Sequence, residues 1–226
     1  MKTLPLVSAA ITILLPFLLQ KTGLSEKYGF KMKMLCAFMY LLTGGLSALA
    51  VNTATAYSIM ILGALCSGAL GDFFLEYKGK KLFPAGVVFF ALGHIAYIST
   101  FLFSGAYRAV DSIAAISLAT VLINALIIIF AKAKLKLNGK KKLLLAYAPV
   151  LVLACLCAVS SGLIAFRQGN ASYGLCLTSG GVLFFASDLM IGIGKGGIKR
   201  PRFLHNAVSY TYFAAQALFA LSIYFQ

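Results

Sequence analysis

The chain is poor in acidic residues, with only five aspartates and glutamates against 20 lysines and arginines. Charged residues of both signs make up 11% of the sequence and hydrophobic residues 61%, whereas soluble domains average about 25% and about 45–50%. A soluble domain of this size could not bury so much apolar surface, so this composition excludes one. The net charge of +15 does not indicate nucleic-acid binding, because the basic residues are confined to a few short loops. The predicted fold class is an all-α, polytopic membrane helix bundle.

The sequence also lacks the motifs of several common chemistries. It has no Gly-x-Ser-x-Gly, no His-x-x-x-His, no phosphate-cradling glycine loop and no apparent Ser-His-Asp arrangement. The five cysteines lie in apolar segments with no histidine at metal-ligand spacing, which is typical of small buried side chains. We therefore expect no metal and no cofactor.

Long apolar runs separated by turn signals predict transmembrane helices, since a β-barrel would show weak alternation instead. One crossing takes about 20 residues, which predicts eight spans within a single transmembrane domain, residues 1–226. The predicted spans are roughly 4–20, 32–51, 55–76, 82–104, 111–131, 142–164, 171–193 and 203–224.

The distribution of lysine and arginine predicts the orientation of these spans. The first, third, fifth and seventh loops carry 17 of the 20 basic residues, and the termini and the other loops carry only Lys2, Arg108 and Arg167. Basic loops stay on the cytoplasmic side of a membrane. We therefore predict a multi-pass protein of the cell membrane, with both termini outside and the basic loops in the cytoplasm, where they meet membrane lipid.

Two of the five acidic residues, Asp72 and Asp188, lie inside hydrophobic segments rather than at the first or last residue of a predicted span or in a loop. A carboxylate there costs roughly 2.5 to 3.5 kcal/mol on insertion scales, which makes each a candidate for a functional site. Asp72 is six residues before Lys78, and Asp188 is seven before Lys195. At about 1.5 Å per residue, both lie on the order of 10 Å inside the membrane boundary. Because their depths match, we predict that they share one pocket.

The surroundings of the two aspartates also predict two related four-helix halves. Each aspartate lies near the end of a span, and each is followed by a basic loop and then by a span with a polar face. The two lie 116 residues and four spans apart. Because four is an even number, the halves would run in the same direction, related by an axis along the membrane normal.

Small and polar residues accompany the two acids. Gly63, Ser67 and Gly71 recur at every fourth position of the third span, a spacing that lets helix backbones approach each other. Polar groups this deep in a membrane normally face protein or a water-filled cavity. Taken singly, a histidine or tyrosine here fits core packing as well as binding. The polar stripes of the fourth and eighth spans include His94, Tyr97, His205, Ser209, Tyr212 and Gln216.

Two carboxylates in one dry pocket do not both ionise easily, so one holds a proton while the other stays charged. Such a pair is a general acid beside a general base. It suits cleavage through an oxocarbenium-like cation, in which the acid protonates, the carboxylate steadies the positive charge, and a deprotonated water attacks. No metal is needed for this chemistry.

Four segments resemble the YhhN-like family of membrane proteins, the lysoplasmalogenases. They occur in the order of the family, and the eight-span layout extends the resemblance over the whole chain. Where the family has a Lys-Pro pair near the start of the second span, this chain has Lys31-Met32-Lys33-Met34, which leaves a role for these lysines open. The four segments are CSGALGDFFL at 66–75, FFALGHIAY at 89–97, FFASD at 184–188 and YTYFAAQ at 210–216.

The resemblance implies an intramembrane ether-bond hydrolase that needs no metal. Its expected substrate is lysoplasmalogen, a lysophospholipid whose vinyl ether bond it cleaves to a fatty aldehyde and glycerophosphoethanolamine or glycerophosphocholine. Asp72 and Asp188 would be the catalytic pair, and the sequence does not assign acid and base between them. The residues expected to bind substrate or water are Ser67, His94, Tyr97, Ser187, Tyr212 and Gln216.

Two other classes of function fit part of the pattern. A proton- or cation-coupled transporter of a small or lipid-like substrate would also use buried acids and two related halves. Against it, the acids lie near one membrane face rather than at the midplane, and no pair of broken helices stands out. A lipid-binding or scaffold protein without catalytic activity is the third alternative.

Overall fold

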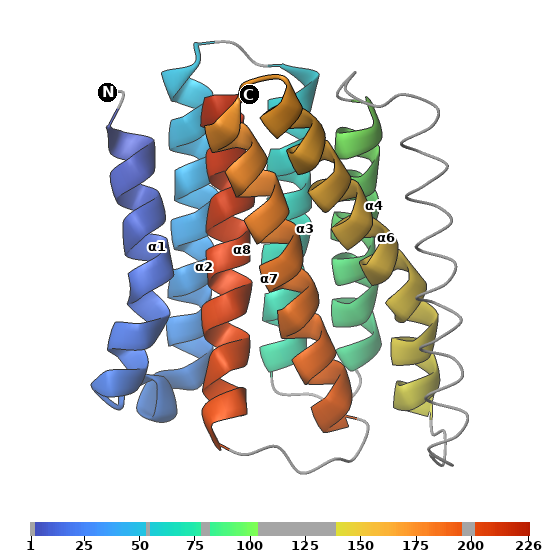
Figure 1. Ribbon diagram of the computed structural model, residues 1–226. Coiled ribbons are helices and arrows are strands. Elements are labelled where there is room, and N and C mark those ends of the chain that lie inside the picture. Colours follow the sequence, from blue (N-terminus) through green and yellow to red (C-terminus); the bar gives the residue numbers. More distant parts are fainter. Residues whose placement is uncertain (1–2, 53–54, 78–81, 104–138, 196–201) are drawn as a thin grey trace.

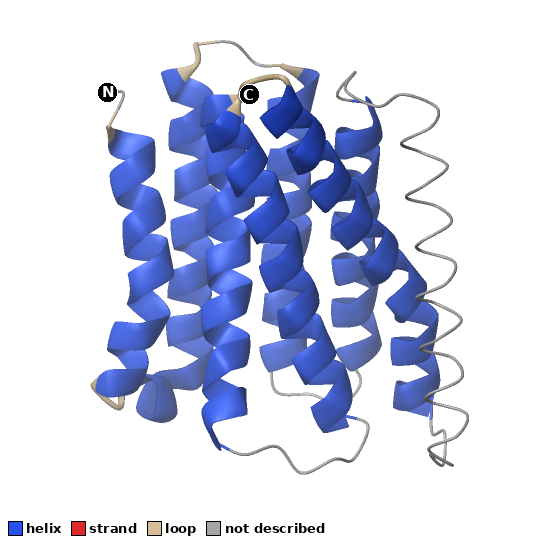
Figure 2. Ribbon diagram, viewed as in Figure 1, coloured by secondary structure: helices blue, strands red, loops and turns tan. Residues whose placement is uncertain are grey.

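The computed structural model describes residues 3–52, 55–77, 82–103, 139–195 and 202–226. Within them the chain forms seven α-helices and no strand (Figure 2). All seven helices are long and apolar enough to cross a membrane, so the chain is a multi-pass membrane protein. The helices are α1 (Leu4–Lys21), α2 (Leu24–Ala50), α3 (Ala56–Glu76), α4 (Phe83–Phe103), α6 (Gly139–Arg167), α7 (Ala171–Lys195) and α8 (Arg202–Phe225).

Seven of the predicted spans coincide with these helices to within a few residues, except at the start of α2. That helix begins at Leu24, eight residues before the predicted span, because the helix continues beyond its apolar part into the residues that follow the turn after α1. The predicted span at 111–131 lies outside the described residues, so the count of eight spans is not confirmed. The single domain and the two related halves also stay predictions.

Local sequence sets several helix ends. The side chain of Thr55 accepts a hydrogen bond of 3.1 Å from the backbone N–H of Ser58 and so caps the start of α3. Asn170 does the same for α7, with its side-chain oxygen 3.1 Å from the N–H of Tyr173. Gly23 has a φ of 72° in the tight turn between α1 and α2, a left-handed conformation that glycine adopts without steric cost.

Helix α8 lies between α1 and α7, with α2 and α3 behind it (Figure 1). It packs against α1, α2, α3 and α7, while α2–α3, α3–α4, α4–α6 and α6–α7 are neighbouring pairs around it. Its buried residues include Tyr212, Gln216 and Ser222, polar side chains that a lipid-facing helix would not carry. Of the polar stripe predicted on the eighth span, Tyr212 and Gln216 therefore face protein.

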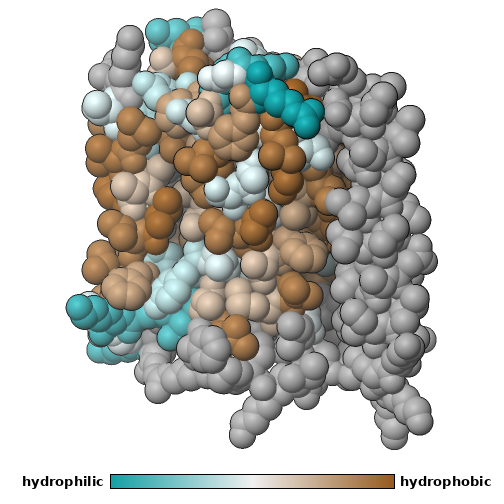
Figure 3. All heavy atoms as spheres, viewed as in Figure 1, coloured by the Kyte–Doolittle hydropathy of each residue, from teal (hydrophilic) through white to brown (hydrophobic). Residues whose placement is uncertain are grey.

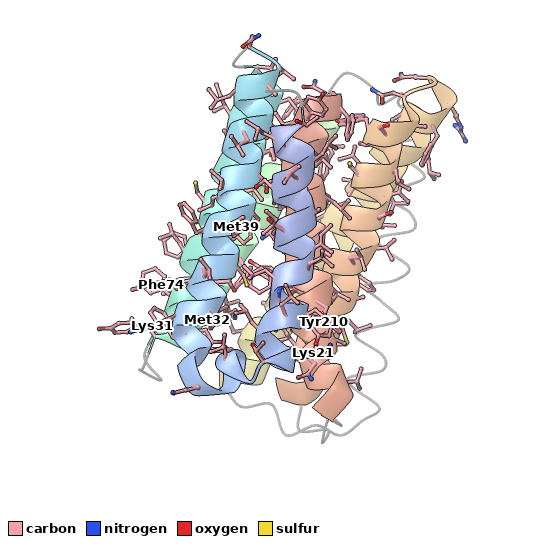
Figure 4. All side chains as sticks on the ribbon, turned by 90° about the vertical axis from the view of Figure 1, so that its left-hand side faces the viewer. Lys21, Lys31, Met32, Met39, Phe74 and Tyr210 are labelled. Atoms are coloured by element: carbon pink, nitrogen blue, oxygen red, sulfur yellow. The ribbon has the colours of Figure 1, made fainter. Side chains whose placement is uncertain are left out.

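Both termini lie at one end of the bundle, and the turn between α1 and α2 lies at the other. We call the latter the basic end, because Lys21, Lys27 and Lys31 lie there. Figure 4 shows Lys21 near Tyr210 and Lys31 near Met32 at this end. Helices α3 and α7 also end at the basic end, and α4, α6 and α8 begin there (Figure 1). Asp72 and Asp188 consequently lie toward the same end of the molecule. That this end faces the cytoplasm stays a prediction.

The outer surface between the two ends is apolar. Figure 3 shows a broad hydrophobic band across the face formed by α1, α7 and α8, with hydrophilic residues gathered toward the ends. Exposed apolar side chains of these helices include Leu14 and Phe17 of α1 and Leu175 and Val182 of α7. Such a band is what the hydrocarbon core of a bilayer requires.

Candidate active site

Asp72 lies on α3 about one turn before the end of the helix, and only 1% of its surface is exposed. Both of its carboxyl oxygens have partners. Lys33 of α2 places its Nζ 3.2 Å from Oδ1, and the hydroxyl of Tyr212 on α8 donates a hydrogen bond of 2.7 Å to Oδ2. Tyr212 and Lys33 are therefore the two direct partners of Asp72, from two different helices.

Lys33 has a second partner at the edge of the bundle. Its Nζ lies 3.1 Å from Oε1 of Glu76, which is one helical turn beyond Asp72 on α3. The side chain of Glu76 is 44% exposed and that of Lys33 is 26% exposed. The ammonium group thus lies between a buried carboxylate and one that faces outward.

Close packing of α4 on α3 holds Asp72 inside the bundle. A Cβ built on Gly71 would lie 2.8 Å from the ring of Phe90, and one built on Gly93 would lie 3.2 Å from the carbonyl oxygen of Ala64. Larger residues at these two positions would separate the helices. Ser67 belongs to the same contact, because its Cβ lies 3.4 Å from the Cβ position of Gly93. Of the predicted small-residue spacing, Ser67 and Gly71 therefore lie at the α3–α4 interface, whereas a Cβ built on Gly63 would meet nothing within 4 Å.

A chain of buried hydrogen bonds extends from Asp72 toward the centre of the bundle. Gln216, one turn beyond Tyr212 on α8, donates from Nε2 to the Tyr212 hydroxyl at 3.0 Å. The hydroxyl of Tyr97 on α4 donates to Oε1 of Gln216 at 2.7 Å. Gly68 lies against this chain, because a Cβ on it would be 2.6 Å from Nε2 of Gln216. Three of the predicted binding residues thus orient one another and Asp72.

Asp188 on α7 is half-buried and has a different set of partners. The hydroxyl of Tyr147 on α6 donates to its Oδ2 at 2.5 Å. That hydroxyl also lies 3.1 Å from Nδ1 of His94, and Nδ1 lies 2.8 Å from the carbonyl oxygen of Phe90. Because a carbonyl oxygen only accepts, Nδ1 carries the hydrogen in this arrangement. His94, Tyr147 and Asp188 therefore form a second polar chain.

Aromatic rings join the two polar chains. The ring of Phe184 on α7 has its centroid 4.6 Å from that of His94 and 5.5 Å from that of Tyr212. Tyr212 is hydrogen-bonded to Asp72, and His94 belongs to the chain that reaches Asp188 through Tyr147. The two acids thus belong to one cluster, walled by aromatic side chains and built from α2, α3, α4, α6, α7 and α8.

A small apolar cavity of about 10 Å³ adjoins this cluster, roughly the space of one water molecule. It lies between α4, α6, α7 and α8. His94 and Tyr97 belong to its lining. The other lining residues are Phe101, Leu151, Ala154, Cys155, Gly181, Phe184, Phe185 and Phe219.

Ser187 lies beside Asp188 but has a partner outside the cluster. Its hydroxyl donates to the carbonyl oxygen of Val208 on α8 at 3.2 Å, and the residue is fully buried. It therefore links α7 to α8 near the acid. A direct role of Ser67 or Ser187 in binding substrate stays a prediction.

Sequence reasoning missed three members of the cluster. Lys33 and Glu76 carried a signal, because both are charged residues at the margins of predicted spans and Glu76 lies one helical turn from Asp72. Tyr147 carried none, since a tyrosine at the start of an apolar helix is ordinary. Across the described residues, no three His, Cys, Asp or Glu side chains are grouped so that they could hold a metal ion.

Comparison with known proteins gives one match. The model of the YhhN family matches residues 27–223, which extend from the start of α2 to the last turn of α8. No curated protein and no solved structure matches the chain.

Proposed function

The chain belongs to the YhhN family, and from this premise we propose that it is an intramembrane hydrolase that cleaves the vinyl ether bond of lysoplasmalogen. The products are a fatty aldehyde and glycerophosphoethanolamine or glycerophosphocholine. The observation that carries the proposal is that hydrogen bonds and aromatic rings link Asp72 and Asp188 to one cluster within a bundle of apolar helices. Two unrelated structural carboxylates would be expensive to keep there.

The chemistry of a vinyl ether fits such a pair. Protonation of the alkenyl carbon distant from the oxygen gives an oxocarbenium ion, which water captures to form a hemiacetal that collapses to the aldehyde and the alcohol. An acid is needed to protonate the carbon in the first step. A carboxylate is needed to stabilise the cation and to accept a proton from the attacking water. Asp72 and Asp188 supply these two groups, and the aromatic rings around them limit the entry of other water molecules.

The location fits a lipid that carries one hydrophobic chain. Such a substrate already resides in the bilayer, with its headgroup at the membrane surface. With the reacting bond beside the acids, the headgroup lies toward the basic end and the chain toward the apolar cavity lined by Phe101 and Phe219. The cavity has to widen to admit the chain, so we expect the surrounding rings to move when substrate enters.

The experiment is aldehyde release from lysoplasmalogen by the purified protein in detergent. Asp72→Asn and Asp188→Asn each keep the shape of the side chain and remove its acid–base function. We expect each to lower kcat by at least about 10²-fold, the range of general acid–base catalysis. The saturated alkyl ether lysophospholipid serves as the matched control, because it offers no double bond to protonate.

Aldehyde release that persists in both variants, or none from the wild type, would rule the proposal out. The proton- or cation-coupled transporter is tested in the same preparation after reconstitution into liposomes. Uptake driven by a proton gradient, without aldehyde release, would favour it.

A further inference from the structure

The two aspartates of the cluster differ in charge environment. Asp72 forms an ion pair with Lys33, at 3.2 Å, and accepts the hydrogen bond of Tyr212. Asp188 accepts a hydrogen bond from the uncharged hydroxyl of Tyr147. Among the residues that the structure describes, no cationic nitrogen lies within 4.0 Å of the Asp188 carboxyl oxygens. The structure is therefore asymmetric where the sequence pattern looked symmetric.

A cation next to a carboxylate favours its ionised form, and a carboxyl group buried without a cation favours its neutral form. We propose that Lys33 is a positioning residue that keeps Asp72 ionised, and that this makes Asp72 the base and Asp188 the proton donor. This inference rests on the proposed function and divides the work of its two acids.

Proton movements balance on this assignment. Asp188 gives its proton to the alkenyl carbon; the π electrons of the double bond form the new C–H bond, and the oxocarbenium ion faces two carboxylates. Water then forms a C–O bond to the cationic carbon and passes a proton to Asp72. In the collapse, the hemiacetal hydroxyl returns a proton to Asp188, while the glycerol oxygen leaves with the proton held by Asp72. Both acids end in their starting states.

Glu76 explains how Lys33 can serve this purpose throughout the cycle. When Asp72 takes up a proton from water, it no longer attracts the ammonium group strongly. Glu76, whose Oε1 lies 3.1 Å from the same Nζ, still attracts the ammonium group. The ammonium therefore stays in place beside Asp72 and favours loss of the proton in the last step.

The first test compares Lys33→Gln, Lys33→Arg and Lys31→Gln. Lys31 is exposed on the same helix, two residues away, and its variant controls for loss of a positive charge near the membrane surface. We expect Lys33→Gln to lower kcat on the order of 10²-fold with KM little changed. Lys33→Arg keeps the charge and should restore most of the activity. The saturated alkyl ether lysophospholipid should inhibit Lys33→Gln and the wild type equally.

These readouts separate positioning from other roles. A large rise in KM and in the inhibition constant of the saturated lipid would mean that Lys33 holds the phosphate of the substrate, and would overturn the inference. Equal losses in Lys33→Gln and Lys33→Arg would mean that the lysine matters only for packing, and would overturn it as well.

The second test asks which of the two aspartates is ionised and acts as the base. Asp72→Ala and Asp188→Ala each remove one side chain, and added formate supplies a free carboxylate. We expect formate to raise the rate of Asp72→Ala by at least about tenfold, because a carboxylate is what general-base catalysis lacks there. Formate should not help Asp188→Ala, where a proton donor is missing. Rescue of Asp188→Ala instead would reverse the assignment. Absence of any vinyl ether cleavage by the wild type would refute the proposed function rather than this division of roles.

Discussion

The substitution Gly68→Ala tests whether the buried hydrogen-bond chain controls Asp72. A Cβ at this position would lie 2.6 Å from Nε2 of Gln216 and 3.4 Å from the hydroxyl of Tyr212. Ordinary contact needs about 3.5 Å, so the amide of Gln216 has to retreat by about 1 Å. Gln216 is 0% exposed, and its other end is held by Tyr97 at 2.7 Å. It can retreat only by lengthening its 3.0 Å bond to Tyr212.

The loss should fall mainly on activity. A displacement of 1 Å near reacting groups can cost about 10²-fold in rate. One weakened hydrogen bond within α8 costs only about 0.5–1.5 kcal/mol of stability. We therefore expect Gly68→Ala to remain folded, to release aldehyde on the order of 10²-fold more slowly, and to show a thermal midpoint in detergent only slightly below that of the wild type.

Gly63→Ala is the matched control on the same helix. A Cβ at Gly63 has nothing within 4 Å, so this variant should have wild-type activity and an equal or higher thermal midpoint. If Gly68→Ala keeps full activity, the chain from Tyr97 through Gln216 does not orient Tyr212 on Asp72, and the reasoning fails. A Gly68→Ala protein that aggregates on size-exclusion chromatography would contradict the expected separation of activity from stability.

Two more substitutions separate the site from the rest of the bundle. Tyr147→Phe removes the donor to Asp188; we expect kcat for aldehyde release to fall about tenfold or more with little change in KM, and unchanged kcat would show that Asp188 needs no orienting partner. Tyr57→Phe removes a buried bond of 2.6 Å to Ser222 near the opposite end, so it should lower stability by about 0.6 kcal/mol and leave the rate of aldehyde release unchanged; a large loss of activity would contradict the placement of the site toward the basic end.

The helices and the depth of the acids could be predicted because both depend on short stretches of sequence. Apolar length sets a span, and the distance from Asp72 to the next lysine sets its depth, wherever the neighbouring helices lie. The contact between Tyr212 and Gln216 follows from sequence for a related reason. They are one turn apart on the same face of α8, so a contact that positions one side chain also places the other next to it.

The partners of the acids could not be predicted in the same way, because they depend on which helices become neighbours. The repeat pattern associates each aspartate with the span that follows it. In the structure, Asp72 forms an ion pair with Lys33 of α2 and accepts a hydrogen bond from Tyr212 of α8. Asp188 accepts a hydrogen bond from Tyr147 of α6. The periodicity of a single helix shows which residues share a face but not which helix that face meets.

The ion pair of Lys33 and Asp72 is difficult to explain as a stabilising device. Replacing a buried ion pair by well-packed apolar residues is often neutral or stabilising by about 1–4 kcal/mol, because charges lose their hydration on burial. In a bilayer the apolar alternative is still easier to accommodate, since the surrounding helices and lipid are apolar too. Asp72 is nevertheless buried, with a lysine and a tyrosine directed at its two oxygens. Such an arrangement holds a charged carboxylate ready at a fixed position, as a base that acts on water inside a membrane requires.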